Sequence, residues 1–328
     1  MDWKLVTILS IFLLINILLL TIIKIKENFD NISLDIGNEI CFYFCNLGLS
    51  ILQKKDFNYV LGNLGINMKE YFFFDSLPSF IKYEYDDIHN CFISNNITNE
   101  FISKIFISAT WSVNNDKLYH FWNCMKPLIH KILDETFQKC LLKKSVNNPI
   151  IHFRCADTPF IKQDGYHFQY YPFFKEALNQ IYIKTNHKYN NVDIMSCSFH
   201  KSNKEKQDSC KIYSESLQRY LKEIGYESSI VCNSNIDDFA TLFYAPAVIS
   251  TSSSFSFMSG FFGNGIFIST ESIEGKICNE SGTYIPAKNV EDKVCNSCKE
   301  FTIYGYNLMH NLVDDYNNTD NVIRLLNN

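Results

Sequence analysis

The feature that most constrains the fold is an alternation of short apolar strands and amphipathic helices in the second half of the chain. The alternation begins at Pro149 and continues to Ser269. Strands are expected from Pro149 onward and over 192–198, 229–232, 247–251 and 265–269, with helices over 171–183, 209–224 and 238–244. Alternation of this kind is typical of parallel strands joined by right-handed crossovers, so we predict an α/β fold with a Rossmann-like sheet.

The first of these strands ends in three side chains that could form a site. His152, Arg154 and Asp157 follow the apolar pair Ile150-Ile151, and the Thr-Pro dipeptide after Asp157 forces a turn. Open α/β sheets bind ligands at the carboxyl ends of their strands. The placement of these side chains therefore suggests a ligand site.

Arginine is rare in this chain, which makes Arg154 informative. Lys and Arg together number 30, but the only arginines are Arg154, Arg219 and Arg324. A planar guanidinium binds phosphate or carboxylate oxygens through two parallel hydrogen bonds, whereas lysine acts as a point charge. Arg154 is therefore either a ligand for an anion or one half of an ion pair with Asp157 or another carboxylate.

A serine-rich loop, Thr251–Ser256, follows the predicted strand 247–251. Its hydroxyls and backbone N–H groups stand where a helix should begin, and such helix starts bind anions. A plain serine-rich turn is the alternative interpretation. The loop leaves the same predicted sheet as Arg154, which favours a shared site.

Three pieces of the second half together resemble a known family. They are His152-x-Arg154-x-x-Asp157, Asp238-Phe-x-x-Leu242 and Ser253-Ser-Phe-Ser256. Their order and spacing are similar to those of glycosyltransferase family 11, the α-1,2-fucosyltransferases, within the group that carries a His-x-Arg-Arg-x-Asp motif. The similarity covers roughly residues 148–270.

Two positions depart from the family pattern. Cys155 stands where the motif has its second arginine, and Ser198-Phe199-His200 stands where the family commonly has Ser-Asp-Asp.

The resemblance implies a GT-B-like, two-domain glycosyltransferase with a Rossmann-like C-terminal half. The expected reaction is inverting transfer of fucose from GDP-fucose to a glycan hydroxyl, in α-1,2 linkage. The implied catalytic residues are Arg154, Asp157 and His152. Arg154 would stabilise the departing diphosphate, while Asp157 would orient Arg154 or act as a base. His152 would contact the donor or simply support the end of the strand.

The resemblance also implies a donor site and a cofactor requirement. Asp238 would bind the guanine or the ribose. The expected GDP-fucose-binding residues are Arg154, Asp238, Ser252, Ser253, Ser254, Phe255, Ser256 and His200. No metal ion and no cofactor are expected, and the partners are GDP-fucose and a glycan acceptor.

The N-terminus carries an apolar run over residues 5–25, long enough to span a bilayer and followed by no small-x-small cleavage site. We predict an uncleaved, single-pass type II anchor with the body in the Golgi or another secretory lumen. Lysines on both sides of the run leave the orientation open. A non-cytosolic body is favoured by twelve cysteines, all after residue 40, and by sequons at Asn31, Asn96, Asn279 and Asn317.

The pairing of the cysteines does not follow from the sequence. Cys295-x-x-Cys298 lacks a second ligand pair, so a disulfide-bonded loop is favoured there over zinc. The net charge of −5 argues against a nucleic-acid partner.

The chain divides into six expected parts, with the main boundary near 143–148. They are a tail (1–4), the anchor (5–25), a stem (26–45), an acceptor-side region (46–147), the GDP-sugar-binding domain (148–275) and a cysteine-containing segment (276–328). A last helix is expected around 304–315.

Three alternative functions stay open. The chain could be a fucosyltransferase of another linkage, protein O-linked or α-1,6. It could be an inactive sugar- or nucleotide-binding relative, or a non-enzymatic membrane protein with a chance motif.

Overall fold

The structure is a computed structural model of the chain. It describes residues 36–60, 68–108, 116–155, 158–161, 168–197, 203–251, 253–271, 302–304, 307–308 and 312–327. The predicted anchor at 5–25 lies outside these ranges, as do Asp157, His200 and Ser252. Within the described ranges, no helix combines the length and the hydropathy needed to cross a membrane.

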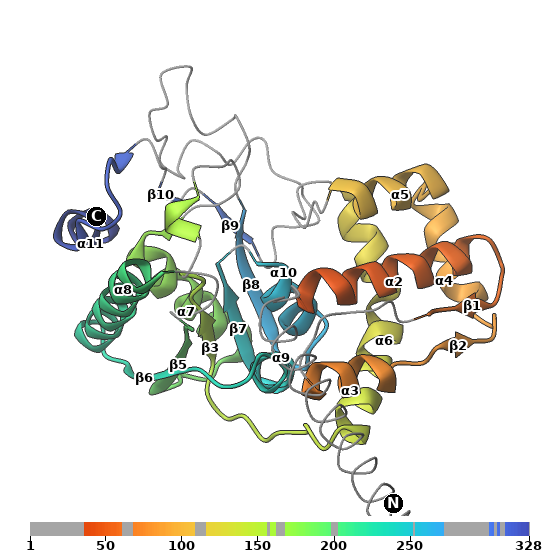
Figure 1. Cartoon of the computed structure of the whole chain (residues 1–328), viewed down its shortest axis with the longest axis horizontal. Helices are drawn as coiled ribbons and strands as arrows, with labels where there is room; N and C mark the ends of the chain where they lie inside the picture. Colours follow the sequence, from red (N-terminus) through yellow and green to blue (C-terminus); the bar gives the residue numbers. More distant parts are fainter. Residues whose placement is uncertain are drawn as a thin grey trace, which may run out of the picture.

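A six-stranded sheet forms the centre of the second half (Figure 1). Its strands are β3 (Ile150–His152), β5 (Asn191–Met195), β6 (Glu227–Val231), β7 (Ala247–Ser250), β8 (Ile266–Glu271) and β9 (Thr302–Tyr304). All neighbouring pairs are parallel, in the order β6-β5-β3-β7-β8-β9. Counted along the chain this is the order 3-2-1-4-5-6 of Rossmann-type sheets. The prediction of a parallel, Rossmann-like α/β fold is confirmed.

Helices cover both faces of this sheet, and its central strands β3 and β7 bury side chains on both faces. Ile151 and Ile249 pack on one face with α7 (Tyr171–Thr185), α8 (Lys204–Glu223) and α11 (Thr319–Leu326). Ile150 and Val248 point to the opposite face, which carries α9 (Asn235–Tyr244), α10 (Ser254–Ser256) and the π-helix η2 (Phe257–Phe261). The connections change face between β3 and β7.

Local signals account for where these helices begin and end. Asn203 and Ser234 cap α8 and α9 by accepting hydrogen bonds from backbone N–H groups in the first turn. A proline stands in the first turn of α7, and Asn186 ends that helix in the left-handed conformation. Helix α9 begins at Asn235, earlier than the residue 238 expected from the sequence, because the Ser234 side chain accepts the Asp237 N–H and caps the helix.

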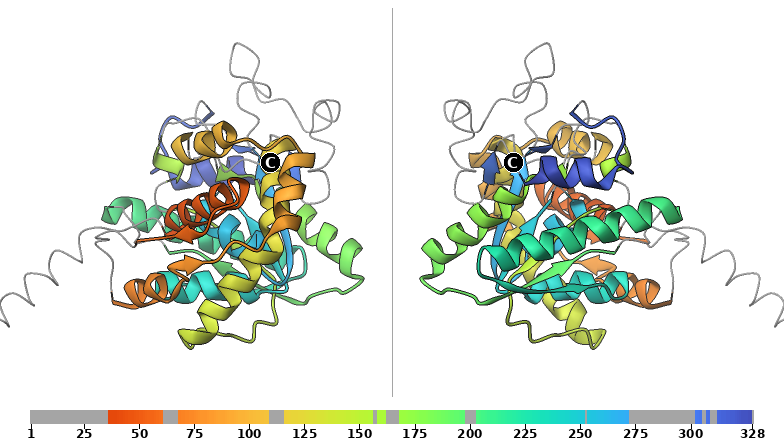
Figure 2. Two further views of the ribbon diagram at one scale, coloured as in Figure 1. Left: turned by 90° about the vertical axis from the view of Figure 1, so that its right-hand side faces the viewer. Right: turned by 90° about the vertical axis from the view of Figure 1, so that its left-hand side faces the viewer.

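The first half is mostly helical in the described residues. It contains α2 (Ile36–Leu52), α3 (Met68–Ser76), α4 (Asp86–Ser94), α5 (Asn99–Ser108), α6 (Asp116–Lys139) and a short antiparallel pair of β1 (Phe57–Asn58) and β2 (Phe80–Ile81). A disulfide between Cys91 and Cys124 joins α4 to α6. Figure 2 shows these red-to-yellow helices on one side of the molecule and the green and teal α7 and α8 on the opposite side.

One continuous apolar core joins the helical half to the sheet. It contains Trp122 of α6, whose ring lies 6.1 Å from Phe257 and 5.6 Å from Phe262. Phe73 of α3 contacts Phe239 of α9 in the same core. The helical half is therefore packed directly onto the α9 face of the sheet.

The expected stem at 26–45 needs a correction. Helix α2 starts at Ile36, and Ile36, Ile40 and Phe44 are buried in the core. Their helical spacing puts them on one face, so residues 36–45 belong to the folded body.

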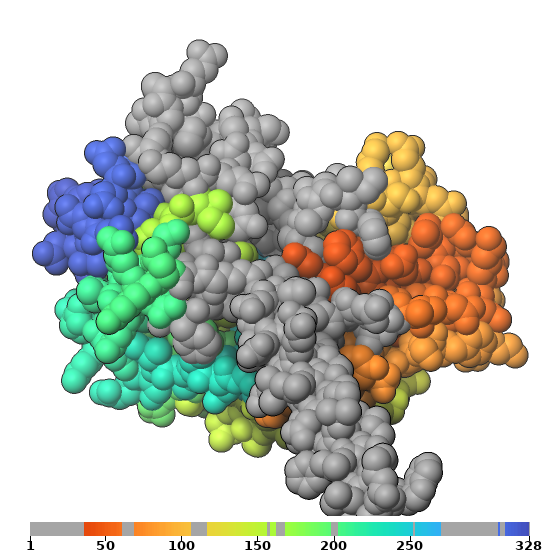
Figure 3. Space-filling model, viewed as in Figure 1, coloured from red at the N-terminus to blue at the C-terminus, as the bar shows by residue number. Residues whose placement is uncertain are grey.

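The C-terminal segment also differs from expectation. The helix expected around 304–315 is wrong, because Tyr304 ends β9 and Asn307–Leu308 forms β10, which pairs with β4 (Phe168–Gln169). The last helix is α11, capped by Asn318 and packed against α8 through Val322 and Leu326. In Figure 3 this segment, in blue, lies beside the green α8 and away from the red and orange helices. The described residues after 275 thus belong to the sheet domain.

Candidate functional site

The carboxyl ends of β3 and β7 lie side by side at the centre of the sheet. His152 is in register with Ser250, and the next residues along each strand lead to Arg154 and to Thr251. This is the point where the order of strands reverses and the connections leave toward opposite faces. In sheets of this order, ligands bind at that point.

Thr251 joins the two strand ends through its hydroxyl. Its Oγ1 accepts a hydrogen bond from the Arg154 N–H at 2.9 Å and donates one to the His152 carbonyl at 2.8 Å. Both partners are backbone groups, so this one side chain fixes the path of the chain on each side of Phe153. Arg154, which is half-buried, therefore starts from a well-defined backbone position.

The serine loop reaches the same place from β7. Ser253 is the N-cap residue of α10, which continues into η2, so the chain is helical from Ser254 to Phe261. Ser256 is buried and is used internally, because its Oγ lies 2.7 Å from Ser250 Oγ. Ser253 and Ser254, which are also buried, stand at the helix start, a position where hydroxyl and N–H groups can bind an anion.

His152 and Phe255 connect the two parts of the site on the α9 face. Their ring centroids lie 5.6 Å apart, and Phe255 also contacts Phe239 of α9 edge-on at 5.2 Å. The aromatic contacts hold the loop over the end of β3. The structure thus brings together His152, Arg154, Ser253, Ser254, Phe255 and Ser256 among the predicted site residues.

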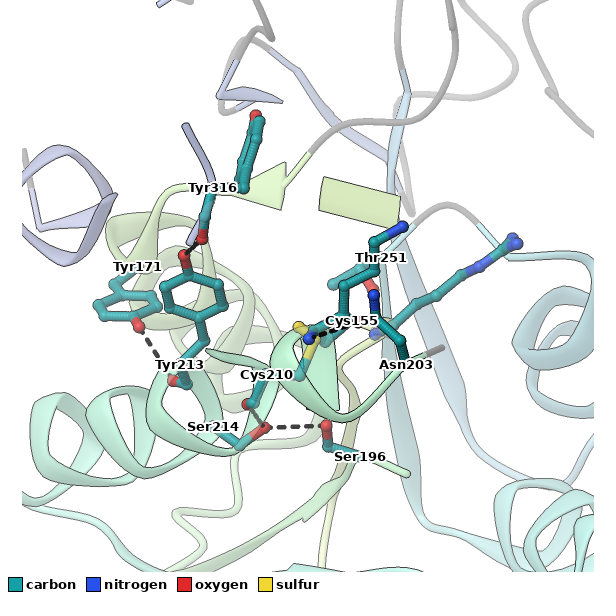
Figure 4. The surroundings of a disulfide bond; sticks show 11 residues. Cys155, Tyr171, Ser196, Asn203, Cys210, Tyr213, Ser214, Thr251 and Tyr316 are labelled. Atoms are coloured by element: carbon teal, nitrogen blue, oxygen red, sulfur yellow. Dashed lines mark hydrogen bonds between the residues drawn. A yellow bond between two sulfur atoms is a disulfide. The ribbon is translucent and has the colours of Figure 1, made fainter. Parts of the chain in front are cut away.

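Cys155 is disulfide-bonded to Cys210 of α8, with Cα atoms 5.6 Å apart (Figure 4). Both cysteines are buried, and they lie in the core between the sheet and α8. The position where the resembled motif has a second arginine therefore points into the protein. Here it carries a covalent bond between β3 and α8 in place of a charge.

Polar groups of α8 beside this disulfide are hydrogen-bonded. The Ser214 hydroxyl lies 2.9 Å from Ser196 Oγ and 2.9 Å from the Cys210 carbonyl oxygen. One turn away, Tyr171 donates to the Tyr213 carbonyl at 3.0 Å. Figure 4 shows these bonds running along α8 beside the disulfide. They fix α8, and with it Cys210, against the sheet.

Asp238 of α9 lies at the ends of β5 and β6, where its carboxylate is buried and hydrogen-bonded. It is 3% exposed, and its carboxylate accepts hydrogen bonds from the Asn233 N–H at 3.0 Å and the Asn233 amide at 2.9 Å. Burial raises the pKa of Asp238, and the two Asn233 donors oppose that shift. The carboxylate predicted to bind the nucleoside is thus occupied in holding the β6–α9 connection.

A disulfide between Cys197 and Cys232 lies against Asp238 and joins the ends of β5 and β6. The two sulfurs and the carboxylate lie within 4.8 Å of one another, a spacing that metal ligands also have. Because the sulfurs are bonded to each other, they are not the thiolates that a metal ion would need. This cluster is a structural one.

No family model, curated protein or solved structure matches the chain. The assignment of a function therefore depends on the residues at β3 and β7. One of them, Thr251, was missed as a site residue by sequence reasoning. A threonine directly after a buried strand, opposite an arginine, is the signal that could have identified it.

Proposed function

We propose that the chain is a membrane-anchored glycosyltransferase that transfers fucose from GDP-fucose, with inversion, to a hydroxyl of a glycan acceptor. The observation that carries the proposal is the meeting of Arg154 and the serine loop at the reversal point of the sheet. A guanidinium on one side and a helix start on the other suit a diphosphate. An α-1,2 linkage is the product proposed.

The mechanism follows from the charge that develops on the leaving group. As the sugar–oxygen bond breaks, negative charge grows on the diphosphate, and Arg154 would bind it through two parallel hydrogen bonds. One such interaction, made more strongly in the transition state, contributes about 3 kcal/mol. Ser253 and Ser254 would hold the same group at the start of α10. His152 would support the loop through Phe255, and Asp157 would orient Arg154.

Ser252 and His200 complete the proposed donor site, and Asp238 is assigned a supporting place beside it. No metal ion is part of the mechanism, because the guanidinium and the helix start supply the positive charge. The helical half would contribute the acceptor side of a GT-B-like arrangement. We expect transfer to proceed unchanged in the presence of EDTA.

Membrane attachment and a secretory lumen are part of the proposal. The apolar run at 5–25 would be the anchor. Disulfides and exposed sequons suit a luminal body: three disulfides join described cysteines, and Asn96 and Asn317 are exposed. Endoglycosidase sensitivity of the protein expressed in eukaryotic cells tests this orientation.

A second candidate is a nucleotide-binding relative without transfer activity. It is favoured by the disulfide of Cys155, because the site then has one arginine of the two in the resembled motif. Fucosyl transfer in another linkage is distinguished from α-1,2 transfer only by the acceptor and the product.

The test uses the full chain in detergent, with GDP-fucose and an array of glycan and glycoprotein acceptors. Transfer of fucose, with GDP binding at least tenfold tighter than UDP in calorimetry, is the expected result. GDP binding without hydrolysis or transfer selects the inactive relative. Equal binding of the two nucleotides contradicts the donor assignment.

A further inference from the structure

The first turn of α2 lies directly against the backbone of the serine loop. A Cβ built on Gly37 would fall 2.4 Å from the Phe255 nitrogen and 2.6 Å from the Ser254 carbonyl carbon. Contacts this short do not occur in proteins, and both atoms belong to the main chain. Figure 1 shows α10 next to the start of α2. The absence of a side chain at position 37 therefore permits this approach.

Small residues continue along the same face of α2. Cys41 and Cys45 follow Gly37 at intervals of four residues, and both are buried with their sulfurs 3.6 Å apart. Burial raises the pKa of the Cys41 thiol, so it stays neutral and behaves as a small apolar group. Gly37, Cys41 and Cys45 therefore put only small side chains on this face of α2, over three successive turns.

The loop that α2 touches is held from the other side as well. Ser256 is bound to Ser250 of β7, and Phe255 packs on His152 and Phe239. The backbone of Ser254 and Phe255 lies between these contacts and α2. A methyl group at position 37 has to displace either the helix or the loop, because its nearest neighbours are main-chain atoms and not side chains that can rotate away.

We propose that Gly37 is a positioning residue for the diphosphate site, so that α2 sets where the serine loop lies relative to Arg154. This inference rests on the proposed function for the identity of the ligand. The loop presents its N–H groups along fixed directions. A displacement of about 1 Å in such a site is enough to lower the reaction rate about 100-fold. The helical half would then contribute to the donor site as well as to the acceptor side.

The test compares Gly37→Ala with Gly48→Ala in the full-length protein in detergent. Gly48 lies in the same helix, and its Cβ would fall 2.8 Å from the ring of Phe121, a short contact away from the loop. We expect Gly37→Ala to raise the Kd for GDP at least tenfold and to speed hydrogen exchange at residues 253–256. Gly48→Ala should lower the Tm while leaving the GDP Kd and that exchange within twofold.

A folded Gly37→Ala variant with wild-type GDP affinity and wild-type exchange in the loop overturns the inference. Should that variant fail to fold, Cys41→Val places extra volume one turn further along the same face, with an expected threefold rise in Kd. An unchanged Kd in folded Cys41→Val would again count against it. Failure of the wild-type protein to bind GDP refutes the proposed function instead, and the exchange rates then decide whether Gly37 positions the loop.

Discussion

The carboxyl ends of β3 and β7 differ from those of β5 and β6, although both pairs belong to one sheet. Between β3 and β7, the hydroxyl of Thr251 joins two backbone segments, and Arg154 and the serine loop stand beside it. Between β5 and β6, the Cys197–Cys232 disulfide joins the two strand ends, and the carboxylate of Asp238 accepts hydrogen bonds from Asn233.

The difference separates groups that could bind a ligand from groups that hold the fold. Both edges bear residue types that suggest chemistry. Among the described residues at the ends of β5 and β6, the two cysteines are covalently bonded and Asp238 is held by hydrogen bonds from Asn233. At the ends of β3 and β7, the hydroxyl of Thr251 bonds the backbone of His152 and Arg154 and so fixes the backbone position from which the Arg154 side chain extends. The following predictions test this division, from the largest expected effect to the smallest.

Removing each disulfide in turn should separate the two edges most clearly. The Cys155–Cys210 and Cys197–Cys232 bonds close separations of 55 and 35 residues, so loop entropy gives each about 4 kcal/mol of stability. We expect Cys155→Ala/Cys210→Ala and Cys197→Ala/Cys232→Ala to lower the unfolding free energy similarly in denaturant titrations. Only the first pair should weaken GDP binding in calorimetry. Equal weakening by both pairs would contradict the division.

Arg154→Lys should remove most fucosyl transfer while leaving the Tm unchanged. Lysine keeps the charge but loses the planar pair of donors, so we expect a loss of about 3 kcal/mol, or roughly 100-fold in kcat/KM. Arg219→Lys in α8 is the matched control and should have wild-type kinetics. Near-normal transfer by Arg154→Lys would exclude the proposed role of the guanidinium.

Asp238→Asn should lower the stability of the fold with little effect on the affinity for GDP. The substitution turns an acceptor into a donor opposite the two Asn233 donors, at a cost of about 2 kcal/mol. Chemical denaturation measures that cost, and the GDP Kd should stay within twofold. A large loss of GDP affinity in a variant of wild-type stability would instead make Asp238 a ligand of the nucleoside.

The same carboxyl should leave a signature in the pH dependence of stability. Its pKa is raised in the folded state, so the folded protein binds its proton more readily than the unfolded chain. The wild-type unfolding free energy therefore gains from Asp238 as the pH falls from the raised folded value toward the ordinary carboxyl range. We expect the stability difference between wild type and Asp238→Asn to widen on acidification over that window.

Thr251→Val should have the smallest effect of these substitutions, and it should weaken the binding of GDP at the site itself. It leaves the Arg154 N–H and the His152 carbonyl without their partner, which costs about 1 kcal/mol or slightly more. We expect a severalfold rise in the GDP Kd. Thr241→Val in α9 removes a hydroxyl that bonds within its own helix and should leave the Kd unchanged. Equal Kd values for the two variants would argue against Thr251 as the link between the strands.

The sequence predicts five of the six strands, because the central strands β3 and β7 are apolar on both faces and the helices between the strands carry clear periodicity. Arg154 and the serine loop could be assigned to one sheet, but their adjacency depends on β3 and β7 being neighbours. The partners of Cys155 and Asp238 could not be inferred. Cys210 is 55 residues away from its partner, and the burial of Asp238 depends on a disulfide that spacing does not reveal. Residues 36–45 were assigned to a stem, although the helical spacing of Ile36, Ile40 and Phe44 places them on one buried face of α2.

The Cys155–Cys210 bond has a consequence for how this site can change during evolution. Losing either cysteine alone removes the covalent link and the stability that it gives, so neither position varies freely without the other. In any set of related sequences, we therefore expect cysteine at 155 and cysteine at 210 to be inherited together.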